Sequence, residues 1–142
     1  MSGRCAVSGG KDRRVLLLLD DVLMSLYLED TGHTINGRAI WRLRKNLVHR
    51  IPKYLRVVVP VGFETDLAST PRVFQAVFPS SGEYRVAAVI HDWLYTKEAN
   101  CSRFLADAIF YSLMLQFGVK TWKATCLYYG VRLGGWKYYQ RR

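Results

Sequence analysis

The hydrophobic pattern changes its period near the middle of the chain, and this change constrains the fold most. Three short apolar segments bounded by turn signals come first, as is typical of antiparallel strands: 40–43, 47–51 and 54–60. Three segments with apolar side chains at helical spacing follow: 83–96, 102–117 and 122–133. The sequence therefore predicts an α+β fold, with a small N-terminal antiparallel β-sheet followed by about three packed α-helices.

Glycines mark the expected ends of these elements. Asp30–Gly32 and Asn36–Gly37 are turn signals, while Gly118 and Gly134–Gly135 lie where helix C-caps are expected. On the last predicted helix, four residues at helical spacing form one apolar stripe: Trp122, Cys126, Tyr129 and Leu133.

The length of 142 residues fits one domain, and no Pro/Gly/Ser-rich linker divides the chain. Residues 1–14 are rich in Gly, Ser, Lys and Arg and lack periodicity, so we expect a flexible basic arm there. A single α+β domain is then expected over residues 15–142. Within it, the apolar run at 15–29 favours strands over a helix.

The formal net charge of +10 predicts attraction to polyanions. Nucleic acid, anionic lipid headgroups and an acidic protein partner all qualify, and a merely solvated basic face is the alternative. No recognition-helix, base-stacking, P-loop or dinucleotide-binding motif is visible, so nucleic acid is expected to be bound only non-specifically through its phosphates.

The cysteines and apolar runs indicate a protein of the cytoplasm. Cys5, Cys101 and Cys126 are an odd number without paired spacing, so reduced thiols are expected. The apolar run at 15–19 is shorter than a secretory signal requires. No run approaches the roughly 20 residues of a transmembrane helix.

The segment A-A-V-I-H-D-W-L-Y, residues 87–95, carries the strongest candidate for chemistry. At helical spacing, a core stripe is predicted from Val86, Ile90, Trp93 and Leu94. On another face, His91, Asp92 and Tyr95 surround the small Ala88, and such a polar patch suits general-base catalysis. The alternative is a buried core histidine beside a surface charge at Asp92.

Asp107 is the expected partner of this patch. It shares a helix face with Phe110 and Met114, so its carboxylate is predicted to be partly buried and to need a partner. Arg103, four residues earlier, is one candidate. His91 is the other, because the short loop at 97–101 should make the two helices antiparallel. A carboxylate on one imidazole nitrogen makes the other nitrogen a better base.

The loop V-P-V-G-F-E-T-D-L-A-S-T-P, residues 59–71, is the third candidate element. Thr65, Asp66 and Ser69 place hydrogen-bonding groups after a turn, and we expect them as binding residues beside the His91 helix. Asp66 would join Asp92 as a metal ligand or orient His91. An Asx-turn or a helix N-cap explains the same residues without any function.

Four motifs together resemble a small phage-encoded family of unknown function, over roughly residues 38–138. They are the loop 59–71, the segment 87–95, R-x-x-A-D at 103–107 and V-R-L-G-G-W at 131–136. The resemblance implies a bacteriophage accessory or virion-associated protein, with other phage proteins as partners. It also implies synthesis in the host-cell cytoplasm and incorporation in the virion.

H-D-x-x-Y followed by R-x-x-A-D is also similar to the two-helix core of phospholipase A-two enzymes. That resemblance implies a base at His91, a calcium ligand at Asp92 and a carboxylate at Asp107 that holds His91, with Tyr95 in support. The disulfide framework and the Gly-rich calcium loop of those enzymes have no counterpart here. Calcium or another divalent cation would therefore need Asp66 and its loop.

Two functions follow from these residues. The first is a hydrolase of lipid or cell-envelope esters that uses His91 and Asp107, on an anionic surface that the basic charge would favour. The second is a non-enzymatic phage structural, assembly or host-interaction protein in which the polar network only locks the helices together. A His-Asp phosphohydrolase would need further histidines at helical spacing, and a cysteine nucleophile lacks a histidine partner in the sequence.

Overall fold

The computed structural model describes residues 7–8, 26–51, 55–67 and 82–139. It divides into two compact units, one spanning Val7–Asp66 and the other holding the helices of the described residues. Antiparallel strands followed by three helices confirm the predicted α+β class. Of the arm expected at 1–14, only Val7–Ser8 falls within the described residues, and the strands expected at 15–25 lie outside them.

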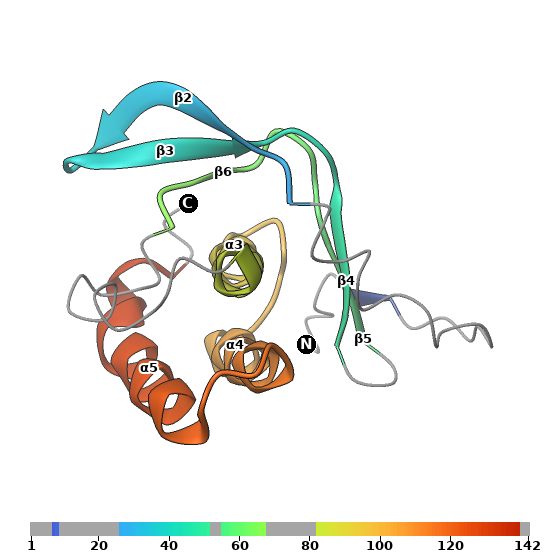
Figure 1. Ribbon diagram of the computed structural model, residues 1–142, viewed down its shortest axis with the longest axis vertical. Coiled ribbons are helices and arrows are strands. Elements are labelled where there is room, and N and C mark those ends of the chain that lie inside the picture. Colours follow the sequence, from blue (N-terminus) through green and yellow to red (C-terminus); the bar gives the residue numbers. More distant parts are fainter. Residues whose placement is uncertain (1–6, 9–25, 52–54, 68–81, 140–142) are drawn as a thin grey trace. The chain divides into compact units, whose positions relative to one another are not determined.

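The strand unit contains two three-stranded antiparallel sheets (Figure 1). In the first, β5 (Leu55–Val59) lies between β1 (Val7–Ser8) and β4 (Leu47–Ile51). In the second, β3 (Arg38–Leu43) lies between β2 (Leu28–Ile35) and β6 (Glu64–Thr65). Alternate residues of β4 are buried, which is the period-two pattern of a strand with one covered face.

The two predicted turns of the first half have different outcomes. Asn36 and Gly37 both adopt positive φ, 53° and 73°, and close the β2–β3 hairpin as expected for a primed turn. The turn predicted at Asp30–Gly32 is wrong, because these residues lie inside β2. There the register shifts between Asp30 and Thr34, and Gly32 supplies a φ of 71° to the irregular strand.

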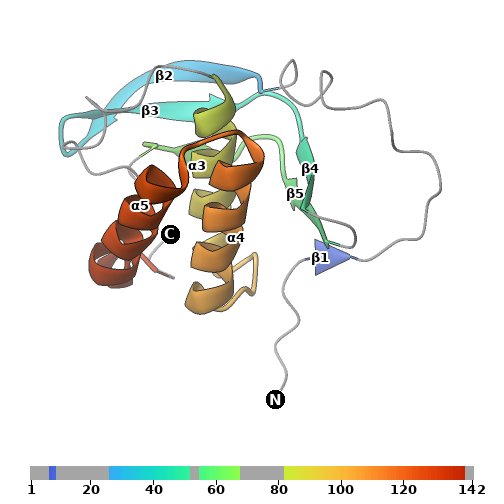
Figure 2. The same ribbon diagram turned by 60° about the horizontal axis from the view of Figure 1, so that its bottom comes forward.

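The three helices lie side by side and run in alternating directions (Figure 2). They are α3 (Gly82–Leu94), α4 (Arg103–Gln116) and α5 (Thr121–Gly134), each within three residues of its predicted bounds, and η1 (Gly135–Lys137) extends the last one. Within the described part of the chain, no helix is long and apolar enough to cross a membrane.

Glycine ends α4 but not α5. Gly118 follows α4 with a φ of 76°, and the amide of Val119 donates to the carbonyl of Met114, as in a left-handed C-cap. The cap predicted at Gly134–Gly135 is wrong, since both residues keep right-handed helical angles and the chain continues into η1.

Candidate functional site

Helix α3 carries His91 and leads directly into Tyr95, two residues of the candidate site. Its residues from Val86 to Asp92 are all buried, so the predicted core stripe is only part of a helix that is covered on several sides. After Leu94 one more helical turn follows, in which the amide of Tyr95 donates to the carbonyl of His91 at 3.1 Å. His91 and Tyr95 therefore share one face, four residues apart.

Helix α4 presents Asp107 to that face. Ser102 caps its N-terminus, and the Ser102 hydroxyl accepts from the amide of Leu105 at 3.3 Å. Asp107, Phe110 and Met114 are fully buried, which confirms the covered face predicted for this helix. The carboxylate must therefore find its partners inside the protein.

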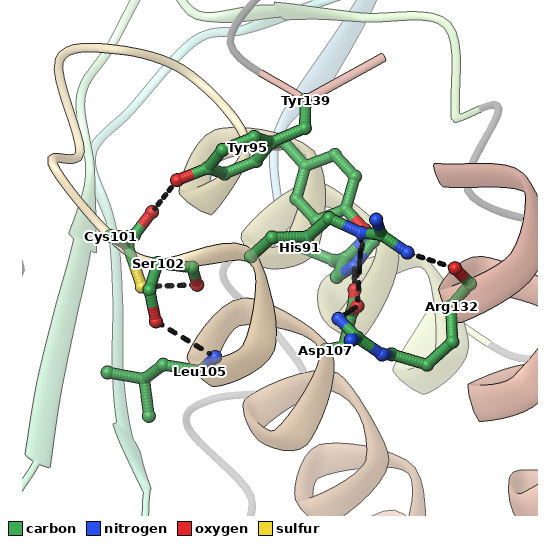
Figure 3. Close-up of polar contacts among 9 residues, drawn as sticks. His91, Tyr95, Cys101, Ser102, Leu105, Asp107, Arg132 and Tyr139 are labelled. Carbon is green, nitrogen blue, oxygen red and sulfur yellow. Dashed lines mark hydrogen bonds and ion pairs between the residues drawn. The ribbon is translucent and has the colours of Figure 1, made fainter. Parts of the chain in front are cut away.

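The structure brings His91, Tyr95 and Asp107 together (Figure 3). His91 Nε2 lies 2.8 Å from Asp107 Oδ1, and the Tyr95 hydroxyl donates to the same oxygen at 2.6 Å. The exposed fraction is 2% for His91 and 0% for Asp107. Two donors from α3 and its last turn thus converge on one carboxylate oxygen of α4.

Two arginines face the other oxygen of the same carboxylate. Arg132 on α5 donates from its guanidinium to Asp107 Oδ2 at 2.9 Å, and Arg103 Nε lies 3.8 Å from that oxygen. Arg103 also donates to the backbone carbonyl of Arg132, so the two arginines are held together. Both partners predicted for Asp107, His91 and Arg103, are therefore close to it. Arg132, on a third helix, is an additional partner.

These contacts set the charge of the network. Burial on its own raises the pKa of Asp107, but hydrogen bonds from His91, Tyr95 and Arg132 outweigh it and hold that pKa below its ordinary value. Burial, together with the hydrogen bond to Asp107, raises the pKa of Tyr95. Asp107 is thus a carboxylate and Tyr95 a neutral phenol at neutral pH.

Aromatic rings enclose the network. The His91 ring centroid lies 4.2 Å from that of Tyr95 and 4.7 Å from that of Phe110. Tyr139 packs edge-on against Tyr95 at 5.5 Å and donates from its hydroxyl to the carbonyl of Cys101 at 2.7 Å. Packed rings leave the imidazole little freedom to rotate, which fixes the nitrogen that faces Asp107.

Gly135 lies against the Tyr95 hydroxyl. A Cβ at this position would be 2.5 Å from the Tyr95 oxygen, although the backbone angles of Gly135 suit any residue. We expect Gly135→Ala to displace Tyr95 and lower the free energy of unfolding by about 1–3 kcal/mol. Gly134→Ala is the matched control, because a Cβ there meets nothing within 4 Å, and it should be neutral or slightly stabilising. Equal melting temperatures for the two variants would contradict the contact.

The structure does not group all the predicted site residues. Asp92 is 6% exposed and has interactions of its own, so the alternative that made it a surface charge is wrong. Thr65 is buried in β6, and Asp66 directly follows that strand in the strand unit. Ser69 lies outside the described residues. The position of the Thr65–Asp66 loop beside the His91 helix therefore stays a prediction.

Metal ligands were also predicted from Asp92 and Asp66. Among the described residues, no group of three or more His, Cys, Asp or Glu side chains is placed to hold a metal ion. Calcium accepts backbone carbonyls and waters as well as carboxylates, so its binding stays a prediction to be tested by experiment.

The sequence interpretation missed Arg132 and Gly135. Arg132 reaches Asp107 from 25 residues away, and no local pattern pairs two such positions. The available signal was the motif V-R-L-G-G-W at 131–136, in which Gly134–Gly135 was interpreted only as a helix C-cap and Arg132 had no predicted partner. A buried carboxylate needs several donors, and the arginine of this motif is one of them.

A family model matches most of this chain. The model of a family described as a protein of unknown function, DUF1353, matches residues 41–131 and so covers all or part of β3–β6 and the three helices. No curated protein and no solved structure matches the chain.

Proposed function

Since this chain belongs to the DUF1353 family of proteins of unknown function, we propose from the site itself that it is a hydrolase of lipid or cell-envelope esters. One observation carries the proposal, the 2.8 Å contact between His91 Nε2 and the buried Asp107 carboxylate. A histidine held in this way is the usual general base for activating water.

The charge of Asp107 fixes the tautomer of His91. A carboxylate only accepts hydrogen bonds, so Nε2 must carry the hydrogen that it donates to Oδ1. The neutral ring then has its lone pair on Nδ1, the nitrogen that would serve as the base in the proposed reaction. Tyr95 and Arg132 hold the carboxylate in place, and its negative charge would stabilise the imidazolium formed on protonation.

The proposed reaction consumes one water for each ester bond. Nδ1 of His91 takes a proton from water while the water oxygen attacks the ester carbonyl carbon. The tetrahedral intermediate collapses, the bond to the alkoxide breaks, and the proton held by His91 passes to the leaving oxygen. The products are one carboxylic acid and one alcohol. A calcium ion held by Asp92 and Asp66 is a separate proposal, and none of these steps uses it.

Extreme burial supports a second candidate, a non-enzymatic structural, assembly or host-interaction protein. Asp107 on α4 accepts hydrogen bonds from α3, from the turn after it and from α5, and it has no exposed surface, as expected of a group that locks a helical unit together. In either role we propose a bacteriophage-encoded accessory or virion-associated protein that works with other phage proteins. The resemblance of residues 59–71 and 87–95 to a phage-encoded family supports this origin.

Hydrolysis assays with controlled calcium test the enzymatic proposal. We expect the wild-type protein to hydrolyse a phospholipid or a simple ester, and Asp92→Asn to lose any stimulation by calcium. Glu98→Gln is the control, since it removes an exposed carboxylate on the loop after α3 and should leave the rate unchanged. A wild-type protein that is inactive on every substrate, with calcium and with chelator, would overturn the hydrolase and leave the structural candidate.

A further inference from the structure

Helix α5 and η1 expose a line of large apolar side chains. We name this line the α5 stripe, and its members are Trp122, Tyr129, Leu133 and Trp136. Their exposed fractions are 60%, 60%, 79% and 57% in that order. Spacings of seven, four and three residues keep the four side chains on one face of a helix.

The stripe is not required for packing the helix. Ala124, Leu127 and Val131 are the buried residues of α5, and helical spacing places them on the side of the helix opposite to the stripe. The apolar stripe expected from the sequence is therefore present but faces outward, opposite to the face that packs. Contiguous exposed apolar side chains on a folded protein usually mark an interaction surface.

Lysines lie beside the two tryptophans at the ends of the stripe. No Asp or Glu follows Asp107 in the sequence, whereas five basic residues besides Arg132, which pairs with Asp107, do: Lys120, Lys123, Lys137, Arg141 and Arg142. The Lys123 ammonium lies 5.5 Å from the ring centroid of Trp122, and that of Lys137 lies 5.7 Å from the ring centroid of Trp136. Each end of the stripe thus combines an indole ring with a positive charge.

We propose that the α5 stripe docks the protein on an anionic lipid surface. Indole and phenol rings favour the headgroup region of a bilayer, lysines at the rim pair with anionic headgroups, and Leu133 supplies a purely apolar anchor. From Trp122 to Trp136 the face is about 21 Å long, which suits a helix lying in the plane of the interface. The inference does not depend on the proposed hydrolysis, although an ester substrate in a membrane would explain both features.

The charges argue against the two other occupants. A second copy of the chain would bring the lysines beside Trp122 and Trp136 of both copies together, on proteins of net charge +10. A nucleic acid would match the charge, but the most exposed member of the stripe is Leu133, which offers nothing to a phosphate and no ring for a base to stack on. Anionic lipid matches both the charge and the apolar side chains.

Vesicle flotation tests the proposal with phosphatidylcholine vesicles, with and without phosphatidylglycerol. We expect binding only where phosphatidylglycerol is present, together with a blue shift of tryptophan emission from Trp122 and Trp136. The double variant Trp122→Ser, Leu133→Ser should reduce partitioning at least about tenfold, since each apolar side chain contributes more than 1 kcal/mol on burial. Its circular dichroism should remain that of the wild type, because both side chains are exposed.

Controls separate the stripe from charge alone. Leu115→Ser removes an exposed leucine of α4 outside the stripe and should bind as the wild type does. Added salt should weaken binding, because the Debye length falls to about 8 Å near 0.15 M. Failure to bind phosphatidylglycerol vesicles would overturn the proposal, as would equal binding by the double variant. If the wild type forms a dimer and the double variant does not, the stripe binds a second copy of the chain. If the wild type binds DNA but not lipid, and the double variant loses the DNA binding, the stripe binds nucleic acid.

Discussion

Replacing His91 by Gln should reduce ester hydrolysis by about a hundredfold or more while the melting temperature changes little. The glutamine amide can still donate to Asp107 Oδ1, so the carboxylate keeps a partner, but no basic nitrogen remains to accept a proton from water. The measurement pairs initial rates with thermal unfolding of the same samples. His33→Gln, at an exposed position of β2, is the control and should change neither quantity.

A second variant separates lost chemistry from lost packing. Phe110→Leu removes the ring that packs on His91 but leaves both of its nitrogens in place. It should lower the melting temperature more than His91→Gln does and lower the rate less. If His91 is purely structural, His91→Gln should instead cost about 1–3 kcal/mol of unfolding free energy, with no wild-type hydrolysis to lose. That pair of results would contradict the general-base role.

Replacing Asp107 by Ala should lower the free energy of unfolding by about 3–5 kcal/mol. The variant leaves the buried donors of His91 and Tyr95 without their acceptor and removes the counter-charge of Arg132. A fall in melting temperature of roughly 10 °C is expected for a chain of this size. Arg132→Ala should cost less, because that side chain is 31% exposed and water replaces part of what it loses.

The pH dependence provides an independent check on Asp107. Because its pKa is lower in the folded protein than the ordinary value of 3.8, its carboxylate contributes stability that is complete above that value. The contribution is lost as the pH falls below 3.8 toward the folded pKa. The difference in unfolding free energy between the wild type and Asp107→Asn should therefore be constant near neutral pH and shrink in acid. A difference that grows on acidification would show that the carboxylate is not stabilised by its donors.

Local sequence patterns were sufficient for most of the fold. Helical spacing defined α3, α4 and α5, and the Asn36–Gly37 turn defined the β2–β3 hairpin, because these signals depend on residues close in the chain. The turn expected at Asp30–Gly32 is absent because residues distant in the chain determine the structure there. There β3 supplies the partner for an irregular strand, and Thr31 donates from its hydroxyl to the carbonyl of Ile40.

The sequence by itself also determined the centre of the candidate site. A short loop between two helices makes them antiparallel, and this brings His91 and Asp107 to the same level on facing sides. Only the tertiary structure decided what completes the network and where the apolar surfaces point. The rotation of α5 about its own axis determines three features. They are the contact of Arg132 with Asp107, the approach of Gly135 to Tyr95 and the outward direction of the α5 stripe. With apolar residues on two faces of α5, periodicity cannot select the inner one, and packing against the other helices makes that choice.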